Sequence, residues 1–382
     1  MEMRQRVIFI ILLAATTLLF GCSKDDAPAN KLKVGAILPL TGPVAFVGAP
    51  ERAALELALV DIRTLYGDEL NVELTVEDSG GDPKTAVTAA NKLIDIDAVD
   101  VLIVSLSRIN LAVAPIVKAK GIVHFATTTS DIGATKITPT TFRVYENFGD
   151  EMELLANFAK RSGIEEIIGA RVNDYAIDQA FDLLKEYGRQ NGIVVREGAV
   201  FAPGTLDYRN ELQKIPPELA PTQALVLLGY GPEFPAALRL LSEMGRGKGK
   251  KLGMYTFLSS AAKSQGTELL QGIQFSGFAK SMADESIKNL SARVQASLPS
   301  FSQTPFINYV YTYDAMMLVA YASHKSKANP ERSITLLESL VLDEPYQGVG
   351  GPIMFDENRD SSVPLAILEY RGDQVHQVWD GK

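Results

Sequence analysis

The sequence predicts an α/β protein with two lobes, each built on a parallel β-sheet flanked by helices. From residue 33 onward, short apolar runs with β-forming residues alternate with stretches whose apolar residues recur at helical spacing. About 350 residues remain once an N-terminal export segment is set aside, which exceeds the usual size of a single hydrophobic core. We therefore expect one parallel sheet in each of two lobes.

The first 22 residues have the composition of an export signal. Arg4 and Arg6 supply positive charge, and residues 7–20 form an unbroken apolar or small-residue run. This run is too short for a stable membrane span but suits a signal-peptide core, so residues 1–21 are expected to be removed. The run ends in Leu-Phe-Gly-Cys, which resembles the bacterial lipobox. The resemblance implies that Cys22 is acylated, whereas the alternatives are a plain secretory signal or a membrane anchor.

Composition restricts the class of protein further. Cys22 is the only cysteine, so the exported part cannot contain an internal disulfide and depends on its core for stability. The formal net charge is -9, which argues against nucleic acid and against electrostatic docking on anionic lipid. The one basic run, residues 246–251, is interpreted as a solvated turn. Residues 22–31 are polar and predict a tether between the lipid and the first lobe.

The first folded unit is predicted to be a strand, a glycine-rich loop and a helix. Residues 34–38 are apolar, residues 39–50 are rich in Gly and Pro, and apolar residues recur at helical spacing over 53–62. In an open parallel sheet such a loop lies at the carboxyl ends of the strands, where ligands bind. The start of the following helix is suited to an anion.

The remaining elements follow in alternation. Up to residue 145 we expect strands at 71–77, 100–104, 122–126 and 142–145, and helices at 83–94 and 109–120. Up to residue 257 we expect helices at 151–162, 177–191, 208–215 and 234–244, and strands at 166–170, 193–200, 224–228 and 252–257. The last part predicts helices at 286–298, 307–323 and 330–342, then strands at 352–355, 365–370 and 374–379.

Four stretches in this order resemble one known family. They are PLTGPVAFVG at 39–48, the strand-turn-helix-strand run at 100–131, TFRVYENFGDE at 141–151 and GVGGPIMFDENRD at 348–360. Together they resemble the periplasmic binding proteins of the Leu/Ile/Val-binding type. Proteins of this family are the solute receptors of ABC importers. Each stretch alone is a weak signal, but together they span nearly the whole mature chain.

The resemblance implies two Rossmann-like lobes joined by a three-crossing hinge, with a small ligand held between them. On this model the N-terminal lobe comprises residues 31–141 and 272–345, and the C-terminal lobe comprises 142–271 and 346–382. The crossings are then expected near 141, 272 and 345. Relatives are commonly monomers, and their partners are ABC permease subunits in the membrane. The resemblance also implies a location in the periplasm or at the cell surface, held there through lipidated Cys22.

Two hydroxyl-bearing turns are the candidate site in the first lobe. Ser105 and Ser107 precede a helix, where free backbone N–H groups and the helix dipole favour a carboxylate. The resemblance implies that Ser107 binds the carboxylate of the ligand, with Ser105 beside it. It also assigns Thr128 and Ser130, after the next strand, to the amino and carboxylate groups of the ligand. The alternatives are an ordinary N-cap and a local Ser/Thr turn.

Three aromatic residues are further candidates by resemblance. Phe46 lies in the first loop, where relatives often place an aromatic residue against the apolar part of the ligand, although a packing role is an alternative. Tyr175 and Tyr230 follow two strands of the second lobe. Relatives can have a second tyrosine where this chain has Gly231, which predicts a bulkier or differently shaped ligand than leucine.

One departure from the family bears on the ligand. Branched-chain amino acid receptors carry a glutamate after the strand expected at 252–257, and residues 252–265 contain no acid. Because a buried ammonium without a carboxylate is costly, either Asp174 or Glu233 replaces that glutamate or the ligand is not an α-amino acid. The second alternative includes aromatic and branched-chain carboxylates.

No enzyme motif or cofactor motif competes with a binding function. The three histidines are far apart in the sequence, and neither a metal-ligand spacing nor a Gly-x-Ser-x-Gly elbow is present. A Ser–His hydrolase using His124 is the enzyme alternative. We therefore expect a receptor that captures a small carboxylate or amino acid, without a cofactor or a metal. A ligand sensor acting on a membrane signalling partner is the alternative of the same fold.

Overall fold

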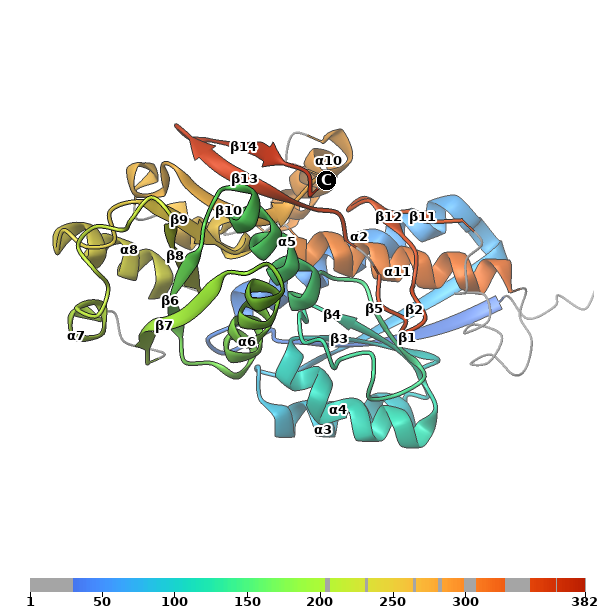
Figure 1. The fold of residues 1–382 in the computed structure, drawn as a ribbon. Coiled ribbons are helices and arrows are strands. Elements are labelled where there is room, and N and C mark those ends of the chain that lie inside the picture. The colour runs from blue at the N-terminus through green and yellow to red at the C-terminus, as the bar shows by residue number, and fades with distance from the viewer. Residues whose placement is uncertain are drawn as a thin grey trace, which may run out of the picture.

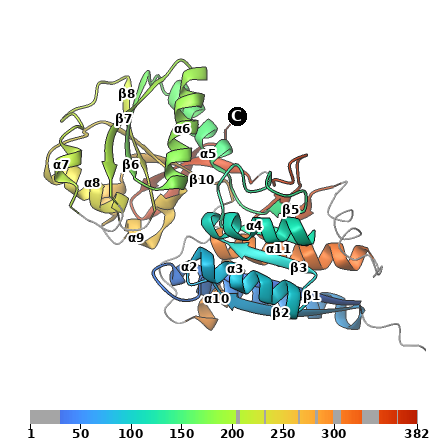
Figure 2. The same cartoon turned by 90° about the horizontal axis from the view of Figure 1, so that it is seen from below.

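The computed structural model describes residues 30–202, 207–230, 233–263, 266–280, 284–298, 307–326, 344–361 and 363–381. Two large sheets with flanking helices form two lobes that lie side by side, as both ribbon views show (Figures 1 and 2). This confirms the predicted fold class. The expected signal peptide, Cys22 and the helix expected at 330–342 lie outside the described residues. Within the described ranges, no helix combines the length and apolarity that a membrane crossing requires.

The first sheet has five parallel strands in the order β2-β1-β3-β4-β5. Its strands are β1 (Asn30–Leu38), β2 (Leu70–Asp78), β3 (Val101–Ser105), β4 (Val123–Thr127) and β5 (Thr141–Arg143). Its helices are α2 (Ala45–Tyr66), α3 (Pro83–Asn91), α4 (Ser107–Lys120), α10 (Glu285–Ser297) and α11 (Ile307–Lys325), with the short turns η1 (Gly67–Glu69) and η2 (Lys92–Ile96).

Both faces of this sheet are covered, which explains why its central strands are mainly apolar and completely buried. All five residues of β3 are buried, as are all five of β4. Helices α2 and α11 pack on one face, and α10 packs against α2, whereas α3 and α4 pack on the other face. The strand ends that carry the candidate residues therefore emerge between two helical layers (Figure 1).

The second sheet has seven strands in the order β14-β13-β10-β9-β8-β6-β7, and only the last two strands of the chain run antiparallel to their neighbours. Its strands are β6 (Glu166–Val172), β7 (Val194–Phe201), β8 (Gln223–Leu228), β9 (Lys250–Gly253), β10 (Ile273–Phe278), β13 (Leu365–Arg371) and β14 (Gln374–Trp379). Helices α5 (Phe148–Arg161) and α6 (Tyr175–Gln190) cover one face. The other elements are α7 (Arg209–Leu212), α8 (Glu233–Glu243), η3 (Tyr255–Leu258), α9 (Ser260–Lys263) and η4 (Thr267–Leu270).

The crossings between the sheets differ from the predicted positions. β5 belongs to the first sheet, so the first crossing is residues 144–147 rather than a point near 141. β10 belongs to the second sheet, which moves the second crossing from near 272 to the segment after Phe278. Asp360 still bridges to Arg143 of β5, so the third crossing lies after residue 361 rather than near 345. The apolar pattern of a strand does not reveal which of two sheets it will join.

The segment before the third crossing packs on the first lobe. It contains a two-stranded antiparallel pair, β11 (Tyr346–Gln347) with β12 (Pro352–Ile353). The buried carboxyl of Asp314 on α11 accepts hydrogen bonds from the backbone N–H groups of Val349 and Gly350, each at 2.7 Å. These bonds hold residues 348–350 against the first lobe.

Two element boundaries were also predicted wrongly. Helix α2 begins at Ala45 and contains Pro50, so the glycine-rich loop is shorter than the expected 39–50. A Cβ atom on Gly48 would lie 2.3 Å from the carbonyl oxygen of Pro39, so glycine lets the helix start pack directly on the end of β1. The strand expected at 252–257 ends at Gly253, because the chain folds back and places the Phe257 ring against that glycine.

Candidate ligand-binding site

The two hydroxyl-bearing turns lie next to each other at the carboxyl ends of β3 and β4. Ser105 ends β3 and pairs in register with Thr127 of β4. Leu106 and Thr128 have φ angles of 77° and 48°, so the chain turns sharply directly after each strand. The two turns are linked by one hydrogen bond between hydroxyls, from Thr129 Oγ1 to Ser107 Oγ.

Glu51 of α2 is the acceptor for two of the predicted site residues. The side chain is completely buried, and its Oε1 accepts hydrogen bonds from Ser105 Oγ at 3.0 Å and from Thr128 Oγ1. A third hydroxyl, Thr312 Oγ1 of α11, lies 3.5 Å away. Burial raises the pKa of Glu51 to about 7, although the hydrogen bonds from these hydroxyls oppose the shift. Ser105 is therefore fully engaged inside the first lobe.

The other two hydroxyls have different partners. Ser107, the first residue of α4, accepts a hydrogen bond from Thr129 Oγ1 at 3.0 Å and keeps its own proton to donate. Ser130 donates its hydroxyl to Oε1 of Glu146, a buried residue of the first crossing. The structure thus brings all four predicted hydroxyls to one region but joins three of them, all except Ser107, to carboxyl groups.

The aromatic candidates are more exposed than the hydroxyls. Tyr175 opens α6 with 61% of its surface exposed, and its hydroxyl accepts a hydrogen bond from Gln179 Nε2 at 2.8 Å. Phe46 lies in the first turn of α2 with 40% of its surface exposed. Tyr230 follows β8 and is partly exposed. All three roles in ligand contact stay predictions.

The two acids expected to face an ammonium group open helices of the second lobe. Asp174 is exposed and caps α6, because its Oδ1 accepts the backbone N–H of Ala176 at 2.9 Å. Glu233 is the first residue of α8. As a cap, Asp174 already has a structural task at the start of its helix.

A buried group at the first crossing was missed by the sequence prediction. Tyr145 of the crossing donates its hydroxyl to that of Tyr255 in η3, at 3.3 Å. Its ring also meets the ring of Tyr311 on α11 edge to face, with centroids 6.2 Å apart. Glu151 of α5 accepts the backbone N–H of Tyr255 at 3.0 Å. Both lobes and the crossing therefore contribute to one polar and aromatic cluster.

The carboxyl groups of this cluster have raised pKa values. Burial raises the pKa of Glu146 well above its usual value, and the negative charge of Glu151 adds to the shift. Burial also raises the pKa of Glu151 to about 7. Because the charged forms of these two carboxyl groups repel each other, the cluster favours the neutral form of at least one of them.

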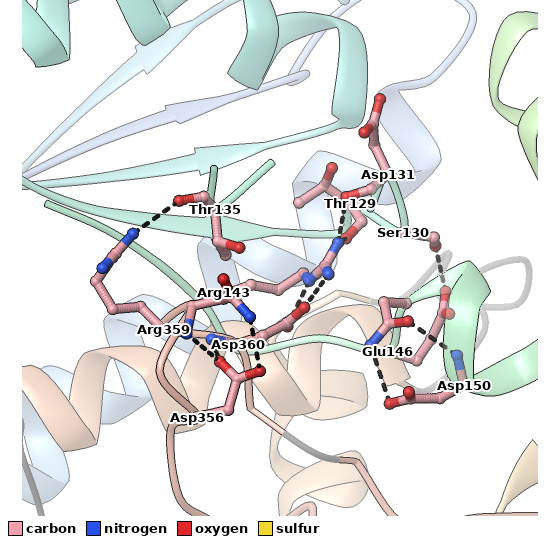
Figure 3. A network of polar contacts seen from close by, with 12 residues as sticks. Thr129, Ser130, Asp131, Thr135, Arg143, Glu146, Asp150, Asp356, Arg359 and Asp360 are labelled. Carbon is pink, nitrogen blue, oxygen red and sulfur yellow. Dashed lines mark hydrogen bonds and ion pairs between the residues drawn. The ribbon is translucent and has the colours of Figure 1, made fainter. Parts of the chain in front are cut away.

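Arg143, the last residue of β5, connects the turn after β4 (residues 128–131, called the ligand turn below) to the segment before the third crossing (Figure 3). Its Nε donates to Asp360 Oδ1 at 2.7 Å, and its Nη2 forms the second half of this ion pair with Oδ2. Its Nη1 donates to the carbonyl oxygens of Thr129 and Asp131, at 3.3 Å to the former. The side chain is fully buried. The Arg143 guanidinium therefore holds the backbone of the ligand turn in place through two of its carbonyl groups.

The helical pattern of α2 contains a sequence signal for Glu51. Glu51 stands four residues from both Val47 and Leu55, on the buried face of α2, where a carboxylate is unexpected. Glu146 offered a weaker signal, as an acid directly after the strand expected at 142–145. Nothing in the sequence marked Tyr145, Tyr255 or Tyr311 as neighbours, because they come from three separate segments.

The enzyme alternative does not gain a catalytic pair. His124 of β4 is buried, and its Nδ1 lies 3.0 Å from Thr141 Oγ1 on the neighbouring strand. Burial lowers its pKa to about 3, so the imidazole is neutral at ordinary pH. Within the described part of the chain, no group of three or more His, Cys, Asp or Glu side chains is suited to a metal ion.

Two α/β lobes with hydroxyl-bearing turns at the strand ends define the class of the two-lobed solute-binding proteins. The chain belongs to the periplasmic binding protein family, whose model matches residues 31–374. This confirms the family resemblance. It also agrees with the expectation that the chain binds a solute and is not an enzyme.

Individual relatives are distant. The Leu/Ile/Val-binding protein homolog 3 of Brucella melitensis biotype 1 is 22% identical over 337 residues, covering 87% of this chain and 89% of the relative. The leucine binding protein of Thermotoga maritima MSB8 matches with a TM-score of 0.75 and 21% identity, covering 91% of this chain and 97% of that one. A solute binding protein of an ABC transporter from Rhodopseudomonas palustris BisB5, in complex with 3,4-dihydroxy benzoic acid, matches with a TM-score of 0.76 and 19% identity, covering 92% and 96%. These structural likenesses show the fold.

Proposed function

We propose that this protein is the solute-binding receptor of an ABC importer, and that it captures a small amino acid or carboxylate between its lobes. The observation that carries the proposal is the pair of adjacent turns at the ends of β3 and β4, where Ser107 keeps a hydroxyl proton to donate at the start of α4. An anionic group of the ligand is favoured there by the hydroxyl, the first N–H groups of the helix and the helix dipole.

Relatives support either type of ligand. The Thermotoga relative is described as a leucine binding protein, and the Rhodopseudomonas relative contains a dihydroxybenzoic acid. Both ligands carry a carboxylate, which is the group that Ser107 would bind. We extend this common feature to the present chain, with a branched-chain or aromatic apolar part.

Binding would be followed by closure of the lobes. The ligand docks on the first lobe through its carboxylate, and closure brings Tyr175 and Tyr230 of the second lobe over it. Closure is favoured only by as much as the ligand prefers the closed form, and about 5.5 kcal/mol of preference shifts a 1:99 ratio to 99:1. Permease subunits in the membrane then recognise the closed form, and acylated Cys22 holds the receptor at the membrane surface outside the cytoplasm.

A thermal-shift screen of the full chain, purified in detergent and freed of carried-over ligand by unfolding and refolding, tests this proposal. A ligand at 100 times its dissociation constant should stabilise the protein by about 2.7 kcal/mol, which gives a clear rise in melting temperature. Ser107→Ala should weaken binding of that ligand about tenfold or more, because a hydrogen bond to a charged group is lost. Ser297→Ala, on the exposed face at the end of α10, should have no effect.

Equal binding by wild type and Ser107→Ala would contradict the assigned carboxylate subsite, and a screen without any stabilising solute would contradict the receptor function. A sensor of the same fold is the second candidate, because the same closure can report to a membrane signalling partner. Permease and ATPase genes beside the gene for this chain favour the importer, whereas a neighbouring membrane kinase or chemoreceptor gene favours the sensor.

A further inference from the structure

Glu146 is a buried carboxyl group with an unused oxygen at the point where the lobes meet. It lies in the first crossing, residues 144–147, and 1% of its surface is exposed. Its Oε1 accepts the Ser130 hydroxyl, and Figure 3 shows the side chain directed at that turn. Its Oε2 is buried and has no hydrogen-bond partner among the described residues. An unsatisfied buried oxygen of this kind is costly unless a ligand supplies a donor.

Arg143 offsets the charge of this carboxyl group only in part, because burial and the charge of Glu151 outweigh its effect. Arg143 is three residues away in sequence, but its guanidinium bonds to Asp360 and to the carbonyl oxygens of Thr129 and Asp131. Glu151 adds a second buried carboxyl group with an unpartnered oxygen, Oε2. The electrostatics of the crossing therefore favour a positively charged N–H donor from outside the chain.

Glu146 lies where the ammonium group of a zwitterionic ligand would be if the carboxylate of that ligand binds at Ser107. Thr129 bonds to Ser107, and the next residue, Ser130, bonds to Glu146. Because successive Cα atoms are about 3.8 Å apart, the carboxylate subsite and the acceptor are neighbours along one short backbone segment. The α-amino and carboxylate groups of an amino acid are likewise neighbours on one carbon atom.

We infer that Glu146 accepts the ammonium group of an α-amino acid whose carboxylate binds at Ser107. This inference rests on the proposed receptor function and deepens it, because it selects amino acids over carboxylates that lack the amine. It also assigns the ammonium to the crossing, so that neither Asp174 nor Glu233 of the second lobe is needed. Tyr145 links the same crossing to Tyr255 of the second lobe, so a ligand held there contacts both lobes.

Isothermal titration of the full chain with matched pairs of probes tests the inference. The pairs are L-leucine with 4-methylpentanoate and L-phenylalanine with 3-phenylpropanoate, in which only the amine is removed. We expect at least one amino acid to bind the wild type at least thirtyfold more tightly than its partner without the amine. Glu146→Gln, which keeps the size of the side chain, should weaken binding of that amino acid ten- to a hundredfold and change binding of its partner less than threefold.

Glu153→Gln is the matched control, because Glu153 is an exposed glutamate on the following helix, α5. Its affinities should equal those of the wild type. The comparison of probes on the wild type does not depend on the folding of any variant, and circular dichroism shows whether Glu146→Gln is folded.

Equal affinity of the wild type for both members of each pair, or an unchanged affinity of folded Glu146→Gln for the amino acid, would overturn the inference while leaving the receptor function in place. A wild type that binds none of the four probes would overturn the inference. If it also fails to respond to every solute of the thermal-shift screen, the receptor function fails with it.

Discussion

Glu51 illustrates how a single buried residue can control the stability of the first lobe. Its Oε1 accepts hydrogen bonds from the hydroxyls of Ser105 and Thr128, whereas its Oε2 has no hydrogen-bond partner among the described residues. A carboxyl group in this position prefers to be protonated, since burial penalises the charged form more than the hydrogen bonds stabilise it. The unliganded protein therefore holds a proton here that an unfolded chain would release.

Glu51→Gln should change the pH dependence of stability in a defined direction. The folded pKa of about 7 exceeds the value of 4.5 expected for the unfolded chain, so the stabilisation is complete below pH 4.5 and is lost as pH rises through 7. Glutamine does not titrate, so the variant should gain about 3 kcal/mol relative to wild type between pH 4.5 and 8. Urea unfolding at these two pH values measures the gain.

Glu56→Gln, on the exposed face of the same helix, is the control for this experiment and should follow the wild type at both pH values. Other buried groups titrate in the wild type and in the variant alike, so the difference between their free energies of unfolding reports on Glu51 alone. Parallel pH profiles for wild type and Glu51→Gln would show that Glu51 has an ordinary pKa in the folded protein.

At the scale of elements, the short segment before the third crossing supports the ligand turn. Asp360 forms an isolated bridge beside β5, and the backbone N–H of Arg143 donates to the carbonyl of Arg359 at 3.0 Å. This segment covers the edge of the five-stranded sheet. Through the Arg143 side chain, it also positions the carbonyl groups of Thr129 and Asp131.

Arg143→Met should destabilise the protein by about 3–5 kcal/mol, because it leaves the carboxylate of Asp360 without its buried partner. Arg196→Met is the matched control, since Arg196 pairs with Glu166 but is 43% exposed, and an exposed pair contributes about 0–1 kcal/mol. Urea unfolding of both variants provides the comparison. A similar, small loss for the two variants would mean that Arg143 does not hold the turn and crossing together.

At the scale of the whole molecule, one hydrophobic cluster runs through both lobes. It includes Ala54 of α2 and Phe125 of β4 in the first lobe, and Ile167 of β6 and Leu184 of α6 in the second. Tyr145 of the first crossing belongs to the same cluster. The lobes are therefore coupled by packing as well as by the covalent crossings.

This coupling predicts a single cooperative unfolding transition for the unliganded protein. The calorimetric enthalpy of unfolding should equal the van't Hoff enthalpy, as for one cooperative unit. Scanning calorimetry at several scan rates provides the measurement and a check of reversibility. Two resolved transitions would show that the lobes unfold independently and that the shared cluster contributes little.

The sequence predicted the sheets well and the crossings less well. Buried strands such as β3 and β8 each contain a continuous apolar run, so their existence and their parallel pairing could be predicted from local pattern. β10 is also largely buried, but its pairing with β9 or with a strand of the first lobe depends on contacts that the local pattern does not contain. This explains the error at the second crossing.

The amino-acid sequence by itself determined the α/β class, the order of the elements, the family and the hydroxyl-bearing turns, because each depends on local composition or on short motifs. Only the tertiary structure decided which carboxyl groups meet those turns. Glu51 is far from Ser105 in the sequence, and Glu146 is separated from Ser130 by β5. The burial and the pKa of both carboxyl groups depend on the packing around them. The electrostatic character of the site is therefore a property of the fold.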